Sequence, residues 1–251
     1  MIKAERHDRI LSELAKNGAV GVQHIAALLE VSEATVRRDL SELDEKKLVR
    51  RSHGGAALRD SHDELPYQSK VTAHLAEKRR IGAKAASLVQ AHQVIGCSGG
   101  TTITQVVRAL RDKPIRVVTN AVNLAMELVH ASDVEVLITG GIFRSRTYEL
   151  VGHVAERTLK DVHLDIAIIG VDGLSLKHGL TTYNNAEAYA CRSIIERASQ
   201  VWVVTDHSKL EQVRPAIIAP IERVHRLITD TGAGNKILEP YKKKGIEVVL
   251  A

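Results

Sequence analysis

The spacing of hydrophobic positions changes near residue 58. Before it, apolar side chains recur every three or four residues, which is the period of short helices with one buried face. The apolar positions of three successive helices are Ile10, Leu11 and Leu14, then Ile25, Leu28 and Leu29, then Val36, Leu40 and Leu43. Asn17-Gly18 predicts the end of the first helix, the second ends near Glu30-Val31, and Ser32 is placed to cap the third.

The connection between the second and third helices is only about three residues long, so the two helices must cross at a steep angle. This is the arrangement of a helix-turn-helix. After Leu48-Val49, the segment RRSHGGA places basic residues around a Gly-Gly pair, which is the composition of a β-hairpin tip. Three helices and a basic hairpin predict a winged helix-turn-helix over residues 1–58.

Beyond this segment the pattern becomes that of an α/β domain. Residues 59–75 are polar and contain Pro66, so we expect a linker there. Over residues 76–251, continuous apolar runs alternate with helical stretches such as 78–88, 121–128 and 187–198. The apolar runs are 94–95, 115–119, 134–138, 166–171, 201–205, 227–228 and 248–250. This alternation predicts a larger effector-binding and oligomerisation domain whose sheet is mostly parallel and covered on both faces.

The third helix presents a polar face opposite its apolar stripe. Arg38 lies on this face near the helix start, the part of a recognition helix that contacts base edges, and its fork suits guanine or phosphate. Asp39 lies nearer the buried side, and we expect it to pair with a basic neighbour. The hairpin suits phosphate contacts because residues 46–59 include no acidic residue, although a solvated basic turn is the alternative. The predicted DNA contacts are Ser32, Ala34, Thr35, Arg37, Arg38, Ser41, Arg50, Arg51 and His53.

The composition fits a folded protein with an aliphatic core. Of the 251 residues, 44% are hydrophobic, and the net charge of +5 is compatible with a nucleic-acid partner. The two cysteines, Cys97 and Cys191, form no metal or redox motif, and we expect buried thiols. The charged start MIKAERHDRI is unlike a signal peptide, and no apolar stretch reaches the roughly 18 residues of a membrane helix. We expect a cytoplasmic protein with no metal site.

Polar residues follow the predicted strands where each one ends. GCSGGTT, residues 96–102, places small residues at a strand-to-helix turn, where free N–H groups suit a phosphate. Parallel strands share one carboxyl edge, so the polar residues after five strands are expected to converge there. Lys209 would neutralise the anion, and Asp172 and Asn120 suit sugar hydroxyls. The predicted effector-binding residues are Ser98, Gly99, Gly100, Thr101, Thr102, Thr119, Asn120, Gly140, Gly141, Arg144, Asp172, Gly173, Glu187, Arg192 and Lys209, with surface salt bridges as the alternative role of both arginines.

Seven segments, spread in order over nearly the whole chain, resemble the DeoR family of bacterial transcriptional regulators. They are SEATVRRDLSEL, LVRRSHGGA, VVTNAVNLA, LITGGIFR, VGHVAERTL, DIAIIGVDGL and VVTDHSKL. The resemblance implies an N-terminal winged helix, a C-terminal domain akin to ribose-5-phosphate isomerase, and regulation by a phosphorylated sugar or sugar-derived intermediate. Ser98 stands where members usually have Asp, and Cys191 stands where Lys usually precedes Arg192. These departures weaken an enzymatic interpretation and leave open a larger, less polar or differently charged effector.

The residues leave two classes of function to compare. The first is a DNA-binding transcriptional regulator, a repressor of a carbohydrate-utilisation operon, which binds double-stranded operator DNA as a homodimer or homotetramer and responds to a phosphorylated sugar or related metabolite. The alternative is a phosphosugar isomerase-like enzyme fused to a nucleic-acid-binding module, for which Glu187 is the best candidate base. RNA binding is disfavoured because the N-terminal half offers no aromatic platform for stacking bases. We predict the regulator, with no catalytic residue and no cofactor.

Overall fold

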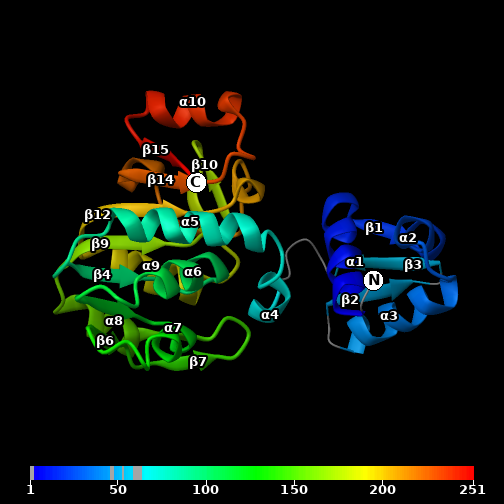
Figure 1. Ribbon diagram of the computed structural model, residues 1–251, viewed down its shortest axis with the longest axis horizontal. Coiled ribbons are helices and arrows are strands. Elements are labelled where there is room, and N and C mark those ends of the chain that lie inside the picture. Colours follow the sequence, from blue (N-terminus) through cyan, green and yellow to red (C-terminus); the bar gives the residue numbers. More distant parts are fainter. Residues whose placement is uncertain (1–2, 46–47, 53, 59–63) are drawn as a thin grey trace. The chain divides into compact units, whose positions relative to one another are not determined.

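The computed structural model describes residues 3–45, 48–52, 54–58 and 64–251 and divides the chain into two compact units, Met1–Ala73 and His74–Ala251 (Figure 1). We call them the N-terminal unit and the C-terminal unit. Each has a hydrophobic core of its own, as a domain requires.

Three helices and a small antiparallel sheet make up the described part of the N-terminal unit up to Leu58. The helices are α1 (Lys3–Asn17), α2 (Val22–Leu29) and α3 (Glu33–Glu45), and the strands are β1 (Ala19–Gly21), β2 (Val49–Ser52) and β3 (Gly55–Leu58). The strands pair in the order β1-β3-β2. This arrangement confirms the predicted winged helix-turn-helix.

The helix ends of the N-terminal unit follow the predicted signals. Gly18 adopts φ 74° and its N–H donates to the Leu14 carbonyl at 2.8 Å, which ends α1. Glu30, in the left-handed region, ends α2. Leu28 is 46% exposed, so it is not part of the buried face of α2. That face consists of Val22, Ile25, Ala26 and Leu29.

The short strand β1 was not predicted. It pairs with β3 at close range, because a Cβ on Gly55 would lie 2.2 Å from the Val20 carbonyl oxygen. The region predicted as a linker also contains structure, since Pro66 precedes the short helix α4 (Tyr67–Lys70). Proline is well suited to a helix start, so it marks an element here rather than a break.

Seven parallel strands form the main sheet of the C-terminal unit. In chain order they are β4 (Val94–Cys97), β5 (Ile115–Thr119), β6 (Val134–Ile138), β9 (Leu164–Ile169), β12 (Ala198–Val204), β14 (Arg226–Thr229) and β15 (Glu247–Leu250). They pair in the order β15-β14-β12-β9-β4-β5-β6. Each strand corresponds to one of the predicted apolar runs, which confirms the α/β fold with a mostly parallel sheet.

Helices cover both faces of this sheet. On one face, α5 (Leu75–Leu88), α6 (Thr101–Ala109) and α7 (Val122–Glu127) share a core with Val117. On the other, α8 (His153–Lys160), α9 (Asn185–Glu196) and α10 (Asn235–Lys243) share a core with Val118. Successive residues of a strand point to opposite faces, so burial on both sides explains the uninterrupted apolar runs.

Further short strands lie outside the main sheet and were missed by sequence analysis. β7 (Ile142–Arg144) pairs with β8 (Glu149–Val151), and β11 (Gly179–Thr182) pairs with both β10 (Gly173–Ser175) and β13 (Ala216–Ala219), all antiparallel. Strands this short show no periodic pattern that could predict them. Throughout the described ranges, the helices are too short or too polar to cross a membrane.

Candidate functional site

The polar face of α3 is exposed, as the helical wheel predicts. Arg38 is exposed and makes no hydrogen bond or ion pair with any described residue. Arg37, in contrast, is held by Glu33, with 2.7 Å between Nη2 and Oε2. Ser32 caps the helix, because the Thr35 N–H donates to its Oγ at 3.2 Å. Arg38 is thus the arginine of α3 that is left to meet another molecule.

Asp39 has the structural role predicted for it. The side chain is 2% exposed, and Arg6 on α1 donates to both of its oxygens, from Nε at 2.7 Å and from Nη2 at 3.0 Å. His7 Nε2 lies 3.2 Å from Oδ1. Burial acts to raise the pKa of Asp39, but the hydrogen bonds and charges of Arg6 and His7 outweigh it and hold the pKa below its usual value. This buried ion pair fixes α3 against α1.

The wing strand β2 is tied to α3 through Arg51. Its Nη1 donates to Ser41 Oγ at 2.8 Å, and Ser41 Oγ donates to the Arg37 carbonyl at the same distance. Arg50, one position earlier in β2, is exposed and has no partner within the described ranges. His53 lies outside the described residues. The basic hairpin therefore supplies one arginine that positions the wing and one that is free.

The sheet order brings the predicted polar strand ends together. β12, β9, β4, β5 and β6 are consecutive neighbours in the sheet and all run parallel, so their carboxyl ends form one rim. From β4 the chain proceeds to β5 on one side, while β9 lies on the other, which makes the β4–β9 boundary a topological switch point. Ser98 spans this boundary, because its Oγ accepts from the Gly170 N–H at 3.0 Å.

The loop after β4 has the geometry of an anion cradle. Gly100 adopts φ 123°, and a Cβ placed on it would meet no atom within 4 Å. It precedes α6 and provides no side chain to cap that helix, so the first N–H groups, which have no intrahelical acceptor in any α-helix, receive no cap from it. Thr101 and Thr102 begin the helix, each 8% exposed. Open space in front of free N–H groups is where a phosphate binds.

A buried carboxylate that sequence analysis missed lies beside this loop. Glu149 on β8 is 6% exposed, and a Cβ on Gly99 would come within 2.3 Å of its Oε1. Asn120, at the end of β5, donates to Glu149 Oε2 at 3.0 Å, while its own Oδ1 is buried without a partner in the described structure. The hairpin β7–β8 brings Glu149 to the rim, and no sequence signal marked that hairpin.

Glu187 and Arg144 meet at the rim as a partly buried ion pair. Arg144 Nε donates to Glu187 Oε1 at 2.9 Å, and the Thr147 hydroxyl donates to the same oxygen. Glu187 is 3% exposed. Both donors belong to the segment around β7, so Glu187 on α9 holds that segment at the rim. A surface salt bridge was the alternative role expected for Arg144. The observed ion pair joins Arg144 to Glu187, another residue of the predicted effector site.

Two further predicted residues complete this part of the rim. Asp172 Oδ2 accepts from the Thr182 hydroxyl at 3.0 Å, and Gly140 is exposed at the end of β6. Cys191 lies close to Ser98, and burial raises its pKa well above the usual value, helped by the charges of Glu149 and Glu187. A protonated thiol thus stands near the carboxylates of Glu149 and Glu187.

Four predicted effector residues are engaged in hydrogen bonds or close packing within the chain. Thr119 is fully buried, donating to the Cys97 carbonyl and accepting from the Ala121 N–H. Gly141 has a positive φ of 134°, and a Cβ on it would lie 2.7 Å from the Val151 carbonyl oxygen. A Cβ on Gly173 would lie 2.5 Å from the Gln212 carbonyl oxygen, so both positions need glycine for close packing. Arg192 donates to the Ile217 and Ile218 carbonyls of β13. We leave these residues out of the proposed site.

Lys209 supplies a cation on the rim. It ends the single turn η1 (His207–Lys209) after β12 and is half-buried. Its ammonium group has no hydrogen bond or ion pair to the described part of the chain. Together with the cradle of α6, it makes this rim suited to an anion.

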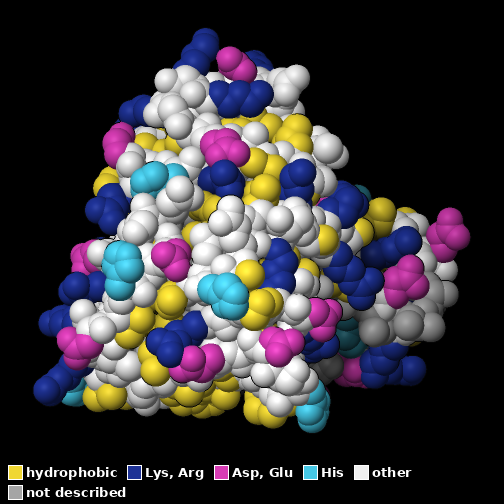
Figure 2. All heavy atoms as spheres, turned by 60° about the vertical axis from the view of Figure 1, so that its left-hand side comes forward, with side chains coloured by type: hydrophobic (Ala, Val, Ile, Leu, Met, Phe, Trp, Pro, Cys, Tyr) yellow, Lys and Arg dark blue, Asp and Glu magenta, His cyan; other side chains and the backbone are white. Residues whose placement is uncertain are grey.

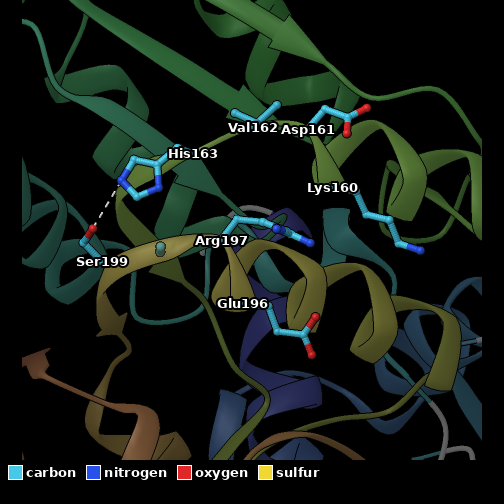
Figure 3. A pocket seen from close by; sticks show the side chains of 8 residues that line it. Lys160, Asp161, Val162, His163, Glu196, Arg197 and Ser199 are labelled. Atoms are coloured by element: carbon cyan, nitrogen blue, oxygen red, sulfur yellow. Dashed lines mark hydrogen bonds between the residues drawn. The ribbon is translucent and has the colours of Figure 1, made fainter.

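A shallow hollow lies at the opposite edge of the sheet (Figure 3). Its lining includes Lys160, Asp161 and His163 before β9, and Arg197 and Ser199 around the start of β12. Ser199 Oγ lies 3.4 Å from His163 Nε2 beside it. Parallel sheets bind ligands at their carboxyl ends, so we assign no function to this hollow.

Comparison with known proteins agrees with both parts of this description. The DeoR-like helix-turn-helix domain matches residues 6–62, and the DeoR C terminal sensor domain matches residues 73–231. The chain is 36% identical over 251 residues to the HTH-type transcriptional regulator GlpR of Haloferax volcanii, covering 99% of this chain and 98% of that protein. It is 32% identical over 251 residues to the glycerol-3-phosphate regulon repressor of Escherichia coli K12, covering 100% of each.

Among solved structures, ribose 5-phosphate isomerase A from Methanocaldococcus jannaschii overlays with a TM-score of 0.42 and 17% identity, covering 55% of each chain. The family matches favour a regulator over an isomerase, because they span both units and describe a DNA-binding domain joined to a sensor. The chain belongs to the DeoR family of helix-turn-helix transcriptional regulators, with an N-terminal DNA-binding domain and a C-terminal sensor domain.

Proposed function

We propose that this protein represses a carbohydrate-utilisation operon and releases its operator when a phosphorylated sugar or polyol binds the sensor rim. The uncapped start of α6 beside Gly100, at the switch point of the sheet, is the observation that carries this proposal. The glycerol-3-phosphate regulon repressor of E. coli supports this proposal, because its sequence aligns with this chain over the full length of both.

In the proposed site, the N–H groups of Gly100, Thr101 and Thr102 bind the phosphate, and Lys209 balances its charge. Asn120 and Asp172 bind hydroxyls, because the buried Asn120 Oδ1 lacks a donor in the described structure and the Asp172 carboxylate already accepts from a hydroxyl, that of Thr182. Gly99 has no side chain, and the Glu149 carboxylate occupies the space that a Cβ on Gly99 would need. Ser98, Arg144, Glu187 and Gly140 frame this space.

On the DNA side, we propose that α3 enters the major groove with Arg38 reading bases, while Ala34, Thr35, Arg37 and Ser41 line the contact. Arg50 would bind a backbone phosphate, and Arg51 would hold the wing in place through Ser41. The operator is double-stranded DNA, and a cytoplasmic location follows from that partner.

We also propose that the protein is a homodimer or homotetramer. Helix-turn-helix operators usually contain paired half-sites, which a symmetric oligomer matches. The C-terminal unit has an apolar surface around β6, the edge strand of the main sheet, that is available for this association. Figure 2 shows hydrophobic side chains along its lower edge, at the level of β6, β7 and α7. Its exposed members are Met126, Val129, Leu137, Ile138, Ile142 and Phe143.

Binding at the rim would act on DNA through linkage. A ligand that prefers the arrangement unable to bind DNA shifts the population towards it, by no more than the ratio of its affinities for the two states. The repressor is therefore expected to bind its effector more weakly when operator DNA is present, by the same factor as the effector weakens DNA binding.

A thermal-shift screen with phosphorylated sugars and polyols tests the proposed site, because ligand binding raises apparent stability by mass action. Each compound is compared with its unphosphorylated counterpart. Gly100→Val should lose the stabilisation, since the branched side chain would occupy the anion space. Gly245→Val is the matched control, because Gly245 also has a positive φ, of 85°, and open space around it, but precedes β15 at the other edge of the sheet. Equal responses of the two variants, each shown to be folded by circular dichroism, would contradict the proposed phosphate site.

A further inference from the structure

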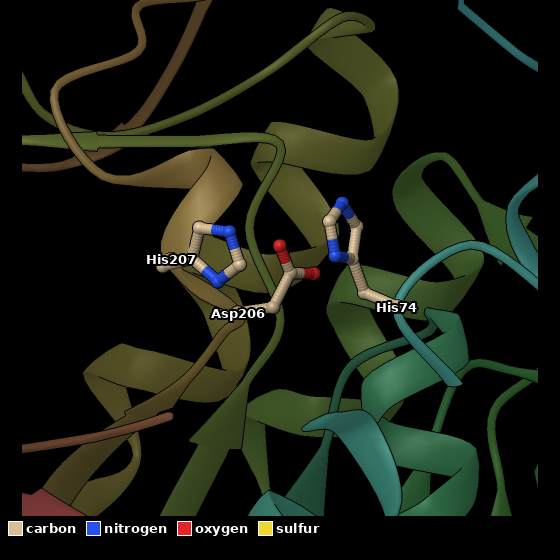
Figure 4. Close-up of side chains that lie close together, drawn as sticks. All are labelled: His74, Asp206 and His207. Carbon is tan, nitrogen blue, oxygen red and sulfur yellow. The ribbon is translucent and has the colours of Figure 1, made fainter. Parts of the chain in front are cut away.

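Three side chains that the proposed effector site does not use lie together near the end of β12 (Figure 4). Asp206 and His207 follow the strand, and His74 immediately precedes α5. One potential ligand atom from each lies within 4.8 Å of the other two. The imidazole rings of His74 and His207 meet edge to face, with centroids 5.1 Å apart.

The ring of His207 is fixed by a buried carboxylate. Asp230 is 1% exposed, and its Oδ2 lies 2.8 Å from His207 Nδ1, while its oxygens also accept from the backbone N–H groups of His207 and Gly232. A carboxylate that engages Nδ1 leaves Nε2 as the free ring nitrogen, as in the carboxylate–histidine pairs that orient metal ligands.

Asp206 supplies an unpartnered oxygen at the same place. The residue is 1% exposed, and its Oδ1 accepts from both the backbone N–H and the hydroxyl of Ser208. Oδ2 makes no hydrogen bond to any described residue. Figure 4 shows the carboxylate between the two imidazoles. This carboxylate oxygen, placed beside two imidazoles, is an acceptor that a cation could use.

We propose that His74, Asp206 and His207 bind a divalent transition-metal ion of the zinc class. Two imidazole nitrogens and one carboxylate oxygen are a ligand set that zinc accepts, and three protein ligands leave one position open for water or an anion. Tetrahedral zinc places its ligand atoms about 3.4 Å apart, so the three groups must approach by roughly 1 Å on binding. His74 is exposed and is the residue free to make that movement.

The site has a defined place in the architecture. His74 is the first residue of the C-terminal unit and the residue before α5, whereas Asp206 and His207 belong to the rim. A bound ion would fasten the entry of the C-terminal unit to the turn that carries Lys209. The proposed effector site shares this turn through Lys209, but its anion cradle is the loop after β4 and it uses none of the three proposed ligands, so either site can fail without the other.

Zinc titration of the full-length, chelator-treated protein by isothermal calorimetry tests this proposal. We expect one Zn²⁺ per chain and at least a 10-fold weaker affinity in His74→Asn. The control is His92→Asn, because His92 is also exposed and also has a left-handed backbone, with φ 66° against 53° for His74, but lies outside the cluster. Asparagine tolerates that conformation in both variants.

A second measurement separates metal ligation from simple surface binding. Co²⁺ in place of Zn²⁺ should give the visible absorption of a low-symmetry, four-coordinate ion in the wild type and in His92→Asn but not in His74→Asn. Asp230→Asn should weaken Zn²⁺ binding about 10–100-fold through its effect on His207. The proposal is wrong if the wild type binds no stoichiometric zinc, or if His74→Asn and His92→Asn bind it equally well.

Discussion

The DNA-binding face and the sensor rim use charged side chains in opposite ways. On α3 and β2, Arg38 and Arg50 are exposed and unpaired within the described structure, and the paired residues beside them hold the helix and wing in place. At the rim, Arg144 is bound to a glutamate that is 3% exposed. A surface that meets a long polyanion keeps its cations available in water, whereas most of the buried carboxylates and Arg144 at the rim are already paired, and only groups such as Lys209 and Asn120 Oδ1 remain for a ligand.

Buried carboxylates show the same contrast. Asp39 accepts three close contacts and serves only to join α1 and α3. At the rim, Glu149, Glu187 and Asp172 surround the space where a ligand is proposed, and Cys191 among them stays protonated. Removing a charge should therefore cost binding on the DNA face, folding stability at Asp39, and smaller local effects at the rim.

The largest effect is expected for Arg38→Ala. A good base contact is worth about 1–3 kcal/mol, and a symmetric dimer loses two of them, so operator affinity should fall by about 2–6 kcal/mol. Fluorescence anisotropy at fixed salt measures this change. Arg9→Ala is the control, since Arg9 is an exposed arginine on α1 paired only with Glu5. Operator affinity equal to that of the control would exclude Arg38 from base reading.

Asp39→Ala should destabilise the N-terminal unit by about 3 kcal/mol, because it leaves Arg6 without its buried partner. Chemical denaturation followed by circular dichroism gives the free energy of unfolding. Glu33→Gln, which breaks the exposed pair with Arg37, should cost about 1 kcal/mol or less. Similar losses in the two variants would contradict the structural role of Asp39.

The same pair predicts a pH dependence. The folded pKa of Asp39 lies below its unfolded value, so its stabilisation is complete above the ordinary carboxyl pKa of about 4 and is lost as the pH falls through the folded pKa. Asp39→Ala should therefore remove part of the acid sensitivity of the wild type. An unchanged acid unfolding curve would argue against this ion pair.

What the sequence could predict follows the same division. The exposure of Arg38 and the burial of Asp39 are properties of one helix, so the helical period predicts both. The rim draws on five strands, and parallel topology predicts that their ends converge. It does not predict that Arg192 turns to the carbonyls of β13, or that Glu149 arrives on the short hairpin β7–β8, because both depend on contacts between distant segments.

A moderate effect is expected for Ser98→Ala. Its Oγ accepts from the Gly170 N–H at 3.0 Å across the switch point, and alanine would leave that donor without its partner, at a cost of about 1–2 kcal/mol in the free energy of unfolding. Ser87→Ala is the control, because Ser87 is an exposed serine bonded only to a carbonyl of its own helix. If the two variants were equally stable, the bridge between β4 and β9 would contribute little.

The smallest effect is expected for Arg50→Ala, and it sharpens the contrast between free and positioning cations on the DNA face. Losing one phosphate contact from each half-site of a dimer should lower the slope of log K against log salt by about 1.8, with equal weakening on operator and random DNA. Arg51→Ala is the informative neighbour, because Arg51 is held by Ser41 and positions the wing instead of standing free. It should therefore change the slope less than Arg50→Ala, while lowering affinity through a less ordered wing. Anisotropy titrations at several salt concentrations, on operator and on random duplexes of equal length, give both slopes. If Arg51→Ala lowered the slope as much as Arg50→Ala, both arginines would contact phosphate. If Arg50→Ala changed operator specificity at constant slope, the wing would read bases.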